Sequence, residues 1–196
     1  MKKIVKNIPF VTIILVIVNI VVTKYFNTPT ITDGFGAADV LAIFSHADGG
    51  HIAYNMGMLF TLGSMAELLL RNRRWIYISM VTVSIVSVVI NNETSNRYGL
   101  GASGWVSAVP FILVFAGLLF WYENRRNECE YLGRFGAIIG SVFGFGGLVI
   151  DYALSQDKVH MSITRTDHIA HISGQMVGIV LALIASAAYG AKLLKK

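Results

Sequence analysis

Long apolar runs alternate with short polar segments along almost the whole chain. A helix that crosses the hydrocarbon core of a bilayer needs roughly 20 mostly apolar residues. Six runs come near that length, namely 8–26, 51–70, 75–91, 102–122, 135–154 and 168–190. The pattern predicts an all-α membrane protein with six transmembrane helices, the third of them short. No long linker divides the runs, so we expect one membrane domain over residues 1–196.

The composition supports this interpretation. Of the 196 residues, 55% are hydrophobic and only 14% are charged, and the mean hydropathy is +0.62. Soluble domains carry about 25% charged residues, so this chain has too few to cover a surface that faces water. The single cysteine, Cys129, excludes a disulfide framework and a cysteine metal cluster.

Lysine and arginine are unevenly divided between the two ends of the predicted helices. With the N-terminus inside, the inner segments hold twelve of them and the outer segments hold four: Lys24, Arg97, Lys158 and Arg165. Cytoplasmic loops of membrane proteins carry the excess of basic residues, so both termini are expected in the cytoplasm. The net charge of +5 therefore indicates topology in a lipid bilayer and no nucleic-acid partner.

Three of the predicted helices carry polar residues near their outer ends. The second begins in "HADGGHIAYNMGMLF", the fourth in "GASGWVSAV" and the sixth in "TDHIAHISGQMVGIV". His51, Ser103 and His171 are therefore expected at one similar, shallow depth. Polar side chains inside a membrane are costly and usually face the bundle interior or a water-filled cavity. The combination predicts a functional site.

Each of these residues also has a simpler structural interpretation. A serine between small residues often eases helix packing, and a histidine at a helix entrance often lies at the membrane interface. His51 and Asn55 are four residues apart and share one helix face, which a hydrogen bond between helices would also explain. Asp167 is expected to cap the sixth helix and is also a candidate for orienting His171.

Together the motifs resemble those of the rhomboid intramembrane serine proteases. The chain has His-x-x-x-Asn on the second helix, Gly-x-Ser-Gly at the start of the fourth and Ala-His-x-x-Gly-x-x-x-Gly on the sixth. The resemblance covers essentially the whole six-helix core and implies a rhomboid-like bundle. The residues that carry it are His46, His51, Asn55, Glu67, Gly101, Ser103, Gly104, His171, Gly174 and Gly178.

The resemblance implies a serine endopeptidase with a catalytic Ser–His dyad. Ser103 would be the nucleophile, and His171 would act first as general base and then as general acid. A serine hydroxyl is a weak nucleophile until an adjacent base takes its proton. The intermediate also needs donors aimed at its oxyanion. His51, Asn55 and the backbone N–H of Ser103 would supply them, and His168 is an accessory candidate.

The resemblance also implies the substrate class and the location. The family cleaves single-span transmembrane proteins near the outer face of the membrane. We therefore expect a multi-pass protein of the cell membrane whose active site faces the extracytoplasmic side. No cofactor or metal is expected, and catalysis is not expected to require an oligomer.

Glycines stand at several positions where helices or substrate would come close. Gly101 and Gly104 would let the chain approach the substrate carbonyl. Gly174 and Gly178 form a small-xxx-small surface that is typical of close packing between membrane helices. The fifth run, "GRFGAIIGSVFGFGGLVI", is consistent either with tight packing or with a loosely packed lateral gate.

The chain departs from the family pattern at the fourth residue after the serine. Many relatives have a tyrosine there that stacks on the catalytic histidine, whereas this chain has Ser107. His171 is then expected to be less firmly held, and Ser107→Tyr is expected to raise the rate of cleavage, or at least not to lower it. The opposite result is expected if Trp105 or Phe145 already fills the space.

Two other functions remain open. One is an inactive rhomboid-like protein that binds transmembrane helices without cutting them, against which the retention of all four proposed catalytic residues argues. The other is a metal-binding or transport protein that uses His160, His168 and His171. Three imidazoles without an intramembrane carboxylate beside them are a poor metal site, which argues against this alternative.

Overall fold

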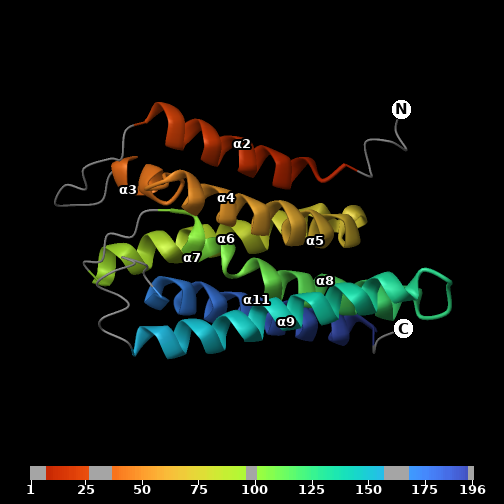
Figure 1. Ribbon diagram of the computed structural model, residues 1–196. Helices are drawn as coiled ribbons and strands as arrows, with labels where there is room; N and C mark the ends of the chain where they lie inside the picture. The colour runs from red at the N-terminus through yellow and green to blue at the C-terminus, as the bar shows by residue number, and fades with distance from the viewer. Residues whose placement is uncertain (1–7, 27–36, 96–100, 157–167, 194–196) are drawn as a thin grey trace.

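The computed structural model describes residues 8–26, 37–95, 101–156 and 168–193, and these form helices and no strand. In chain order the elements are α2 (Phe10–Tyr25), α3 (Ala37–Ala42), α4 (Gly49–Met58), the π-helix η1 (Leu59–Gly63), α5 (Ser64–Leu69), the 3-10 turn η2 (Arg71–Arg73), α6 (Arg74–Ser95), α7 (Ser103–Val106), α8 (Val109–Asn124), α9 (Glu130–Ser155) and α11 (His168–Leu193). The long helices run along a common direction (Figure 1).

Each of the six predicted apolar runs has a helical counterpart. Four helical segments in the described chain are long and apolar enough to cross a membrane: Arg71–Asn91, Ser103–Asn124, Glu130–Ser155 and His168–Gly190. The first run corresponds to α2, an apolar helix of 16 residues. The second corresponds to α4, η1 and α5, which follow one another without a break in helical backbone. The third helix is longer than predicted, because α6 continues through polar residues to its last turn.

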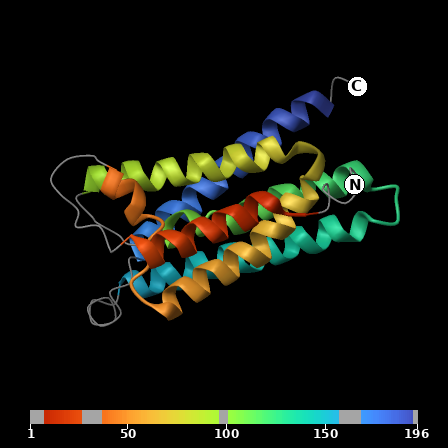
Figure 2. The same cartoon turned by 90° about the horizontal axis from the view of Figure 1, so that it is seen from above.

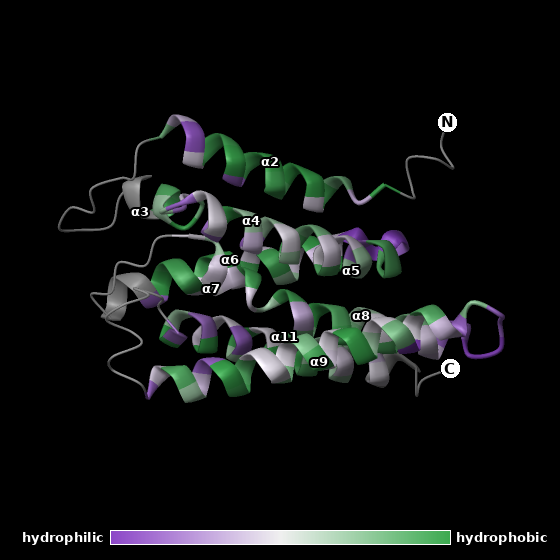
Figure 3. Ribbon diagram, in the orientation of Figure 1, coloured by the Kyte–Doolittle hydropathy of each residue, from purple (hydrophilic) through white to green (hydrophobic). Residues whose placement is uncertain are grey.

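The exposed surface of the bundle is apolar along its middle. Hydrophilic residues gather at the turn between α8 and α9, at the start of α4 and in the first turns of α11 (Figure 3). Large apolar side chains are exposed between these ends, among them Ile138, Val142, Val149 and Leu183. A soluble protein rarely exposes an apolar surface of this extent, so the chain is an integral membrane protein.

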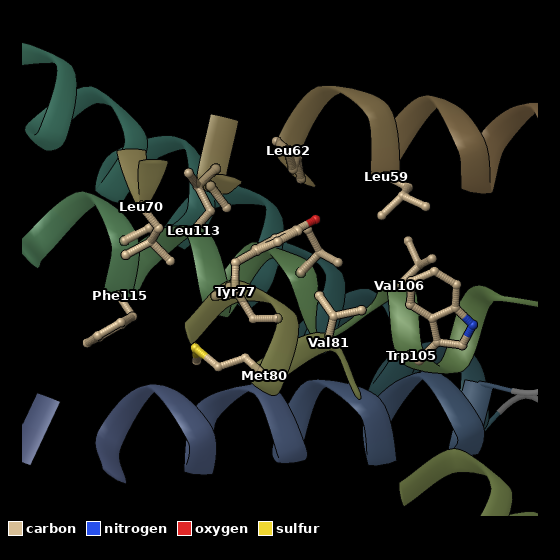
Figure 4. Packing of buried hydrophobic residues seen from close by; sticks show 14 of the residues in the cluster. Leu59, Leu62, Leu70, Tyr77, Met80, Val81, Trp105, Val106, Leu113 and Phe115 are labelled. Carbon is tan, nitrogen blue, oxygen red and sulfur yellow. The ribbon is translucent and has the colours of Figure 1, made fainter. Parts of the chain in front are cut away.

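α8 is the central helix of the bundle. It contacts α5, α6, α9 and α11, and 72% of the apolar window in its segment is buried, against 11% for α9. A helix that is apolar on all sides is expected to be enclosed by other helices. Its side chains Leu113 and Phe115 pack with Tyr77 and Met80 of α6 in the core (Figure 4).

α9 packs on α8 through glycines. A methyl group on Gly133 would lie 2.5 Å from the backbone nitrogen of Trp121, and one on Gly117 would lie 2.5 Å from that of Ala137. Gly140 is equally close to the carbonyl oxygen of Pro110, at 2.5 Å. The two backbones are therefore in direct contact, as small residues allow in membranes. Of the two interpretations of the glycine-rich run, these contacts support tight packing.

Glu67 on α5 holds the start of α2 and the start of α6 together. Its carboxylate is fully buried and accepts hydrogen bonds from the backbone nitrogens of Val11 at 3.2 Å and Thr12 at 2.9 Å. It also forms an ion pair with Arg74 Nε at 3.2 Å. The first N–H groups of a helix have no partner within it, and a negative charge there is stabilised by the helix dipole. This motif residue is therefore a structural clamp.

Candidate active site

Residues from four helices come together at one end of the bundle. Ser103 is the first residue of α7, and His171 lies in the first turn of α11. His51 lies in the first turn of α4 with Asn55 one turn later, and Asp151 lies in the last turns of α9. The starts of α4, α7 and α11 and the end of α9 lie at the same end in Figure 1, away from α5.

α7 and α11 touch backbone to backbone. A side chain on Gly174 would overlap the carbonyl oxygen of Gly104, and one on Gly178 would lie 2.8 Å from the carbonyl oxygen of the α8 N-cap residue. Gly104 directly follows Ser103, and Gly174 comes about one helical turn after His171. The contact between the two glycines therefore places the turn of α11 that carries His171 alongside Ser103.

The imidazole of His171 is bonded to a carboxylate on α9. Nδ1 of His171 lies 3.0 Å from Oδ1 of Asp151, and Nδ1 of His168 lies 2.8 Å from the same oxygen. The other carboxylate oxygen accepts a hydrogen bond from Gln175 Nε2 at 2.9 Å. Asp151 is only 8% exposed, and these three donors satisfy it. When Nδ1–H of His171 donates to a carboxylate, Nε2 is left as the basic nitrogen.

The sequence motifs did not identify Asp151. The carboxylate considered for orienting His171 was Asp167, which lies outside the described residues, as does His160. A signal was present nonetheless, because Asp151 is the only acidic residue in the run 135–154, and an intramembrane carboxylate is costly and tends to mark function. The premise that no intramembrane carboxylate lies beside the histidines is wrong, because Asp151 bonds to both His168 and His171.

Asp151, His168 and His171 also form a group that could hold a metal ion. Each offers one ligand atom, and the three atoms lie within 4.8 Å of one another. Two imidazoles and one carboxylate are a ligand set found in catalytic zinc sites. The donor set therefore fits a transition metal.

Ser103 is placed by a glycine turn. Gly101 has φ +112°, a conformation that glycine adopts readily because it has no Cβ, and its N–H donates to the carbonyl oxygen of Ala42 at 3.0 Å. Among the described residues the Ser103 hydroxyl forms no hydrogen bond, so its bond to His171 is not made in this structure. Such bonds are often long in enzymes without substrate and shorten in the complex.

α4 places His51 and Asn55 beside this turn. The His51 ring lies against Gly101, since a Cβ there would be 2.7 Å from its Cε1 atom. Asn55 is 2% exposed, and its Nδ2 group has no partner among the described residues. A buried donor without a partner is unfavourable for folding, and an oxyanion would satisfy it.

His46 supports His51 from the segment before α4. The two rings meet edge to face with their centroids 5.0 Å apart, and Nδ1 of His46 lies 3.2 Å from Oγ1 of Thr23 on α2. Burial lowers the pKa of His46 from 6.5 to about 4, and the nearby His51 lowers it further in the same direction. The ring is therefore neutral at neutral pH.

The remaining predicted residues have different roles. His168 is 4% exposed and bonds to Asp151, so it does not face water. Each of the two rings considered as substitutes for the missing tyrosine has another aromatic neighbour: Trp105 lies 6.1 Å from the ring of Phe44, and Phe145 lies 5.3 Å from that of Phe111.

A groove of about 300 Å³ borders the site between α6 and α11. Val88 lines it and also lies 3.1 Å from the Cβ position of Gly104, so the groove adjoins the turn that carries Ser103. Neither Ser103 nor His171 is among its lining residues. The groove is therefore a neighbour of the candidate site and does not contain its reactive groups.

Comparison with known proteins gives one match. The family model described as Rhomboid domain matches residues 37–188. The matched region is more than half of the chain and includes all the candidate site residues, while α2 precedes it. No curated protein and no solved structure shows a significant match.

Proposed function

This chain belongs to the rhomboid family, and on this premise we propose that it is a serine endopeptidase that cleaves transmembrane helices with a Ser103–His171 dyad. The observation that carries the proposal is the contact between Gly174 and Gly104, because it sets the base-bearing turn of α11 beside the nucleophile. The bond from His171 to Asp151 supports it further, since it leaves Nε2 available as a base.

The proposed reaction has two proton transfers. Nε2 of His171 takes the Ser103 hydroxyl proton while the oxygen attacks the scissile carbonyl carbon. The same nitrogen then gives the proton to the leaving amide nitrogen, and water later releases the acyl group by the reverse sequence. Asn55, His51 and the Ser103 backbone N–H stabilise the oxyanion, and the amide donor of Asn55 has no partner among the described residues with which the oxyanion would compete.

We further propose six membrane spans within one domain over 1–196, with both termini in the cytoplasm. The start of α2 and the end of α11 lie at the same end of the bundle, and the proposed site lies at the other end (Figures 1 and 2). The end of the bundle that holds the start of α2 and the end of α11 carries the excess of Lys and Arg and is therefore the cytoplasmic end. The site then faces the extracytoplasmic side of the cell membrane. The substrates are single-span membrane proteins.

A fluorophosphonate probe tests the nucleophile. We expect the purified protein to be labelled, Ser103→Ala to abolish the labelling, and Ser107→Ala, which removes a hydroxyl one turn away, to retain it. The reason is that only a serine activated by a base reacts with such probes. Labelling that survives Ser103→Ala would overturn the dyad.

Metal binding is the second candidate function, and the group of Asp151, His168 and His171 favours it. A chelator separates it from proteolysis. The fluorophosphonate labels a protease of the proposed kind equally with and without chelator. A protein whose activity depends on the metal loses that activity when the chelator removes the metal. An inactive rhomboid-like protein is labelled under neither condition.

A further inference from the structure

We propose that Asp151 is a positioning residue, so that the site works as a Ser103–His171–Asp151 triad in place of a dyad. This inference rests on the function proposed above. Nδ1 of His171 lies 3.0 Å from Oδ1 of Asp151. Because only a protonated nitrogen can donate to a carboxylate, this bond fixes the tautomer whose Nε2 accepts the serine proton.

The negative charge of Asp151 is held without a permanent cation. His168, His171 and Gln175 stand at spacings of three and four residues, which place them on one face of α11. All three meet the same carboxylate, at 2.8, 3.0 and 2.9 Å. Among the described residues no lysine or arginine pairs with Asp151. The charge therefore remains available to stabilise the imidazolium that forms when His171 takes a proton.

The carboxylate also supplies the support that the missing tyrosine would give. Ser107 has no ring to place against His171, and its hydroxyl donates a hydrogen bond to the carbonyl oxygen of Ser103 at 2.6 Å. Among the described residues, the His168 ring meets that of His171 edge to face, with the centroids 5.8 Å apart. That ring is bonded to Asp151 as well. Orientation of the base is thus assigned to one carboxylate on α9.

The proposed reaction transfers one proton to His171 and then from His171 to the leaving group, and Asp151 stays ionised throughout. As the bond between Ser103 Oγ and the carbonyl carbon forms, the carbonyl electron pair moves to oxygen and the hydroxyl proton moves to Nε2 of His171. The imidazolium keeps its Nδ1–H on the Asp151 carboxylate. When the carbon–nitrogen bond breaks, the leaving nitrogen takes the proton from Nε2, and the neutral imidazole is restored.

The test compares two substitutions that nearly preserve side-chain shape, one at the carboxylate residue itself and one at a residue that donates a hydrogen bond to it. Asp151→Asn removes the charge while keeping a polar side chain for Gln175 and His168. Gln175→Met removes one donor but leaves the Asp151–His171 bond intact. We expect Asp151→Asn to lower kcat by about 10²–10⁴-fold, with KM and Tm near those of the wild type, because the tautomer is no longer fixed. We expect Gln175→Met to retain kcat within about tenfold.

A second variant keeps the proposal testable if Asp151→Asn does not fold. In Asp151→Ala a small carboxylate can enter the space left by the side chain, so added formate should restore part of kcat, whereas added formamide should not. A structural role for Asp151 predicts equal effects of the two.

The outcomes separate the two proposals. A labelled wild-type protein in which Asp151→Asn keeps its kcat, or loses it only in step with Tm, overturns the triad and leaves the dyad. A wild-type protein that the fluorophosphonate does not label overturns the proposed function and the triad with it. Absence of formate rescue in a folded Asp151→Ala protein also counts against the triad.

Discussion

Glu67 and Asp151 are two buried carboxylates that lie at opposite ends of the bundle and have different partners. Glu67 accepts hydrogen bonds from two backbone amides and the Thr12 hydroxyl and pairs with the guanidinium of Arg74. Asp151 meets two imidazoles and one side-chain amide. Each carboxylate joins its own helix to at least one other helix.

The difference lies in what the partners can do. Backbone amides and a guanidinium keep their protons throughout the physiological pH range, so the Glu67 network has one state and serves to hold α2, α5 and α6 together. An imidazole gains and loses a proton near neutral pH, so the partners of Asp151 can change charge during a reaction. Two carboxylates of similar burial are thus suited to different tasks.

The largest expected effect is the loss of stability in Glu67→Ala. This change leaves Arg74 and the first amides of α2 without their buried acceptor, so we expect the free energy of unfolding to fall by about 3–5 kcal/mol. Denaturation in mixed detergent micelles measures it. Glu67→Gln should fall between this variant and the wild type because its carbonyl still accepts. An unchanged midpoint for Glu67→Ala would contradict the clamp.

At the other end of the bundle we expect a substitution to have a large effect on catalysis and a small effect on stability. Asn55→Ala should lower kcat by about 10²–10³-fold through loss of one oxyanion donor, with little change in Tm, because the Nδ2 group has no partner to lose among the described residues. Cleavage of a model transmembrane substrate measures it. Asn19 is a matched control, a fully buried asparagine on α2, and Asn19→Ala should keep kcat. A fall in Tm that accounts for the lost activity of Asn55→Ala would favour a structural role.

A smaller effect is expected from Ser107→Tyr, and its direction differs from the one that the sequence alone indicates. The Cβ of Ser107 lies 3.5 Å from the Cβ position of Gly174, within the contact of α7 with α11. A ring placed there overpacks the contact and should lower stability by about 1–3 kcal/mol. Since Asp151 already orients His171, we expect no gain in kcat. A higher kcat with an unchanged Tm would show that His171 lacks support.

The smallest expected effect is a pH dependence of stability that arises from His46. Its pKa falls from 6.5 in the unfolded chain to about 4 in the folded protein, chiefly through burial. Folding therefore favours the neutral ring, and the stabilisation that is complete above pH 6.5 is lost as the pH falls toward 4. His46→Gln should flatten the decrease of Tm over this interval. A decrease as steep as that of the wild type would assign it to another group.

The helices could be predicted from the sequence because apolar length decides where a helix can cross a bilayer. The pattern could not show that α6 continues to Ser95, because the polar residues of its last turns fall outside an apolar window while still forming helix. The change to π-helix at Leu59–Gly63 was equally invisible, since no breaker residue such as proline marks it.

The candidate site was predictable only as far as local motifs reach. Ser103, His51 and His171 stand at helix starts, and helix starts at one side of a membrane share a depth. The Asp151–His171 bond joins α9 to α11 across residues that carry no motif, and the direction in which a side chain faces around a helix depends on packing with its neighbours. The contact of Gly174 with Gly104 could not be predicted for the same reason, because it too depends on how neighbouring helices pack.

The placement of His171 on α11 has a consequence for biosynthesis. The ribosome makes α11 after every other described helix, and the earlier helices already hold Ser103, Asn55 and Asp151. Under the proposed mechanism, the growing chain then contains the nucleophile without its base during membrane insertion, and we expect it to cleave no neighbouring membrane protein. The proposed activity would then begin only when Gly174 of α11 packs on Gly104 of α7, so that assembly of the bundle would itself be the activation step.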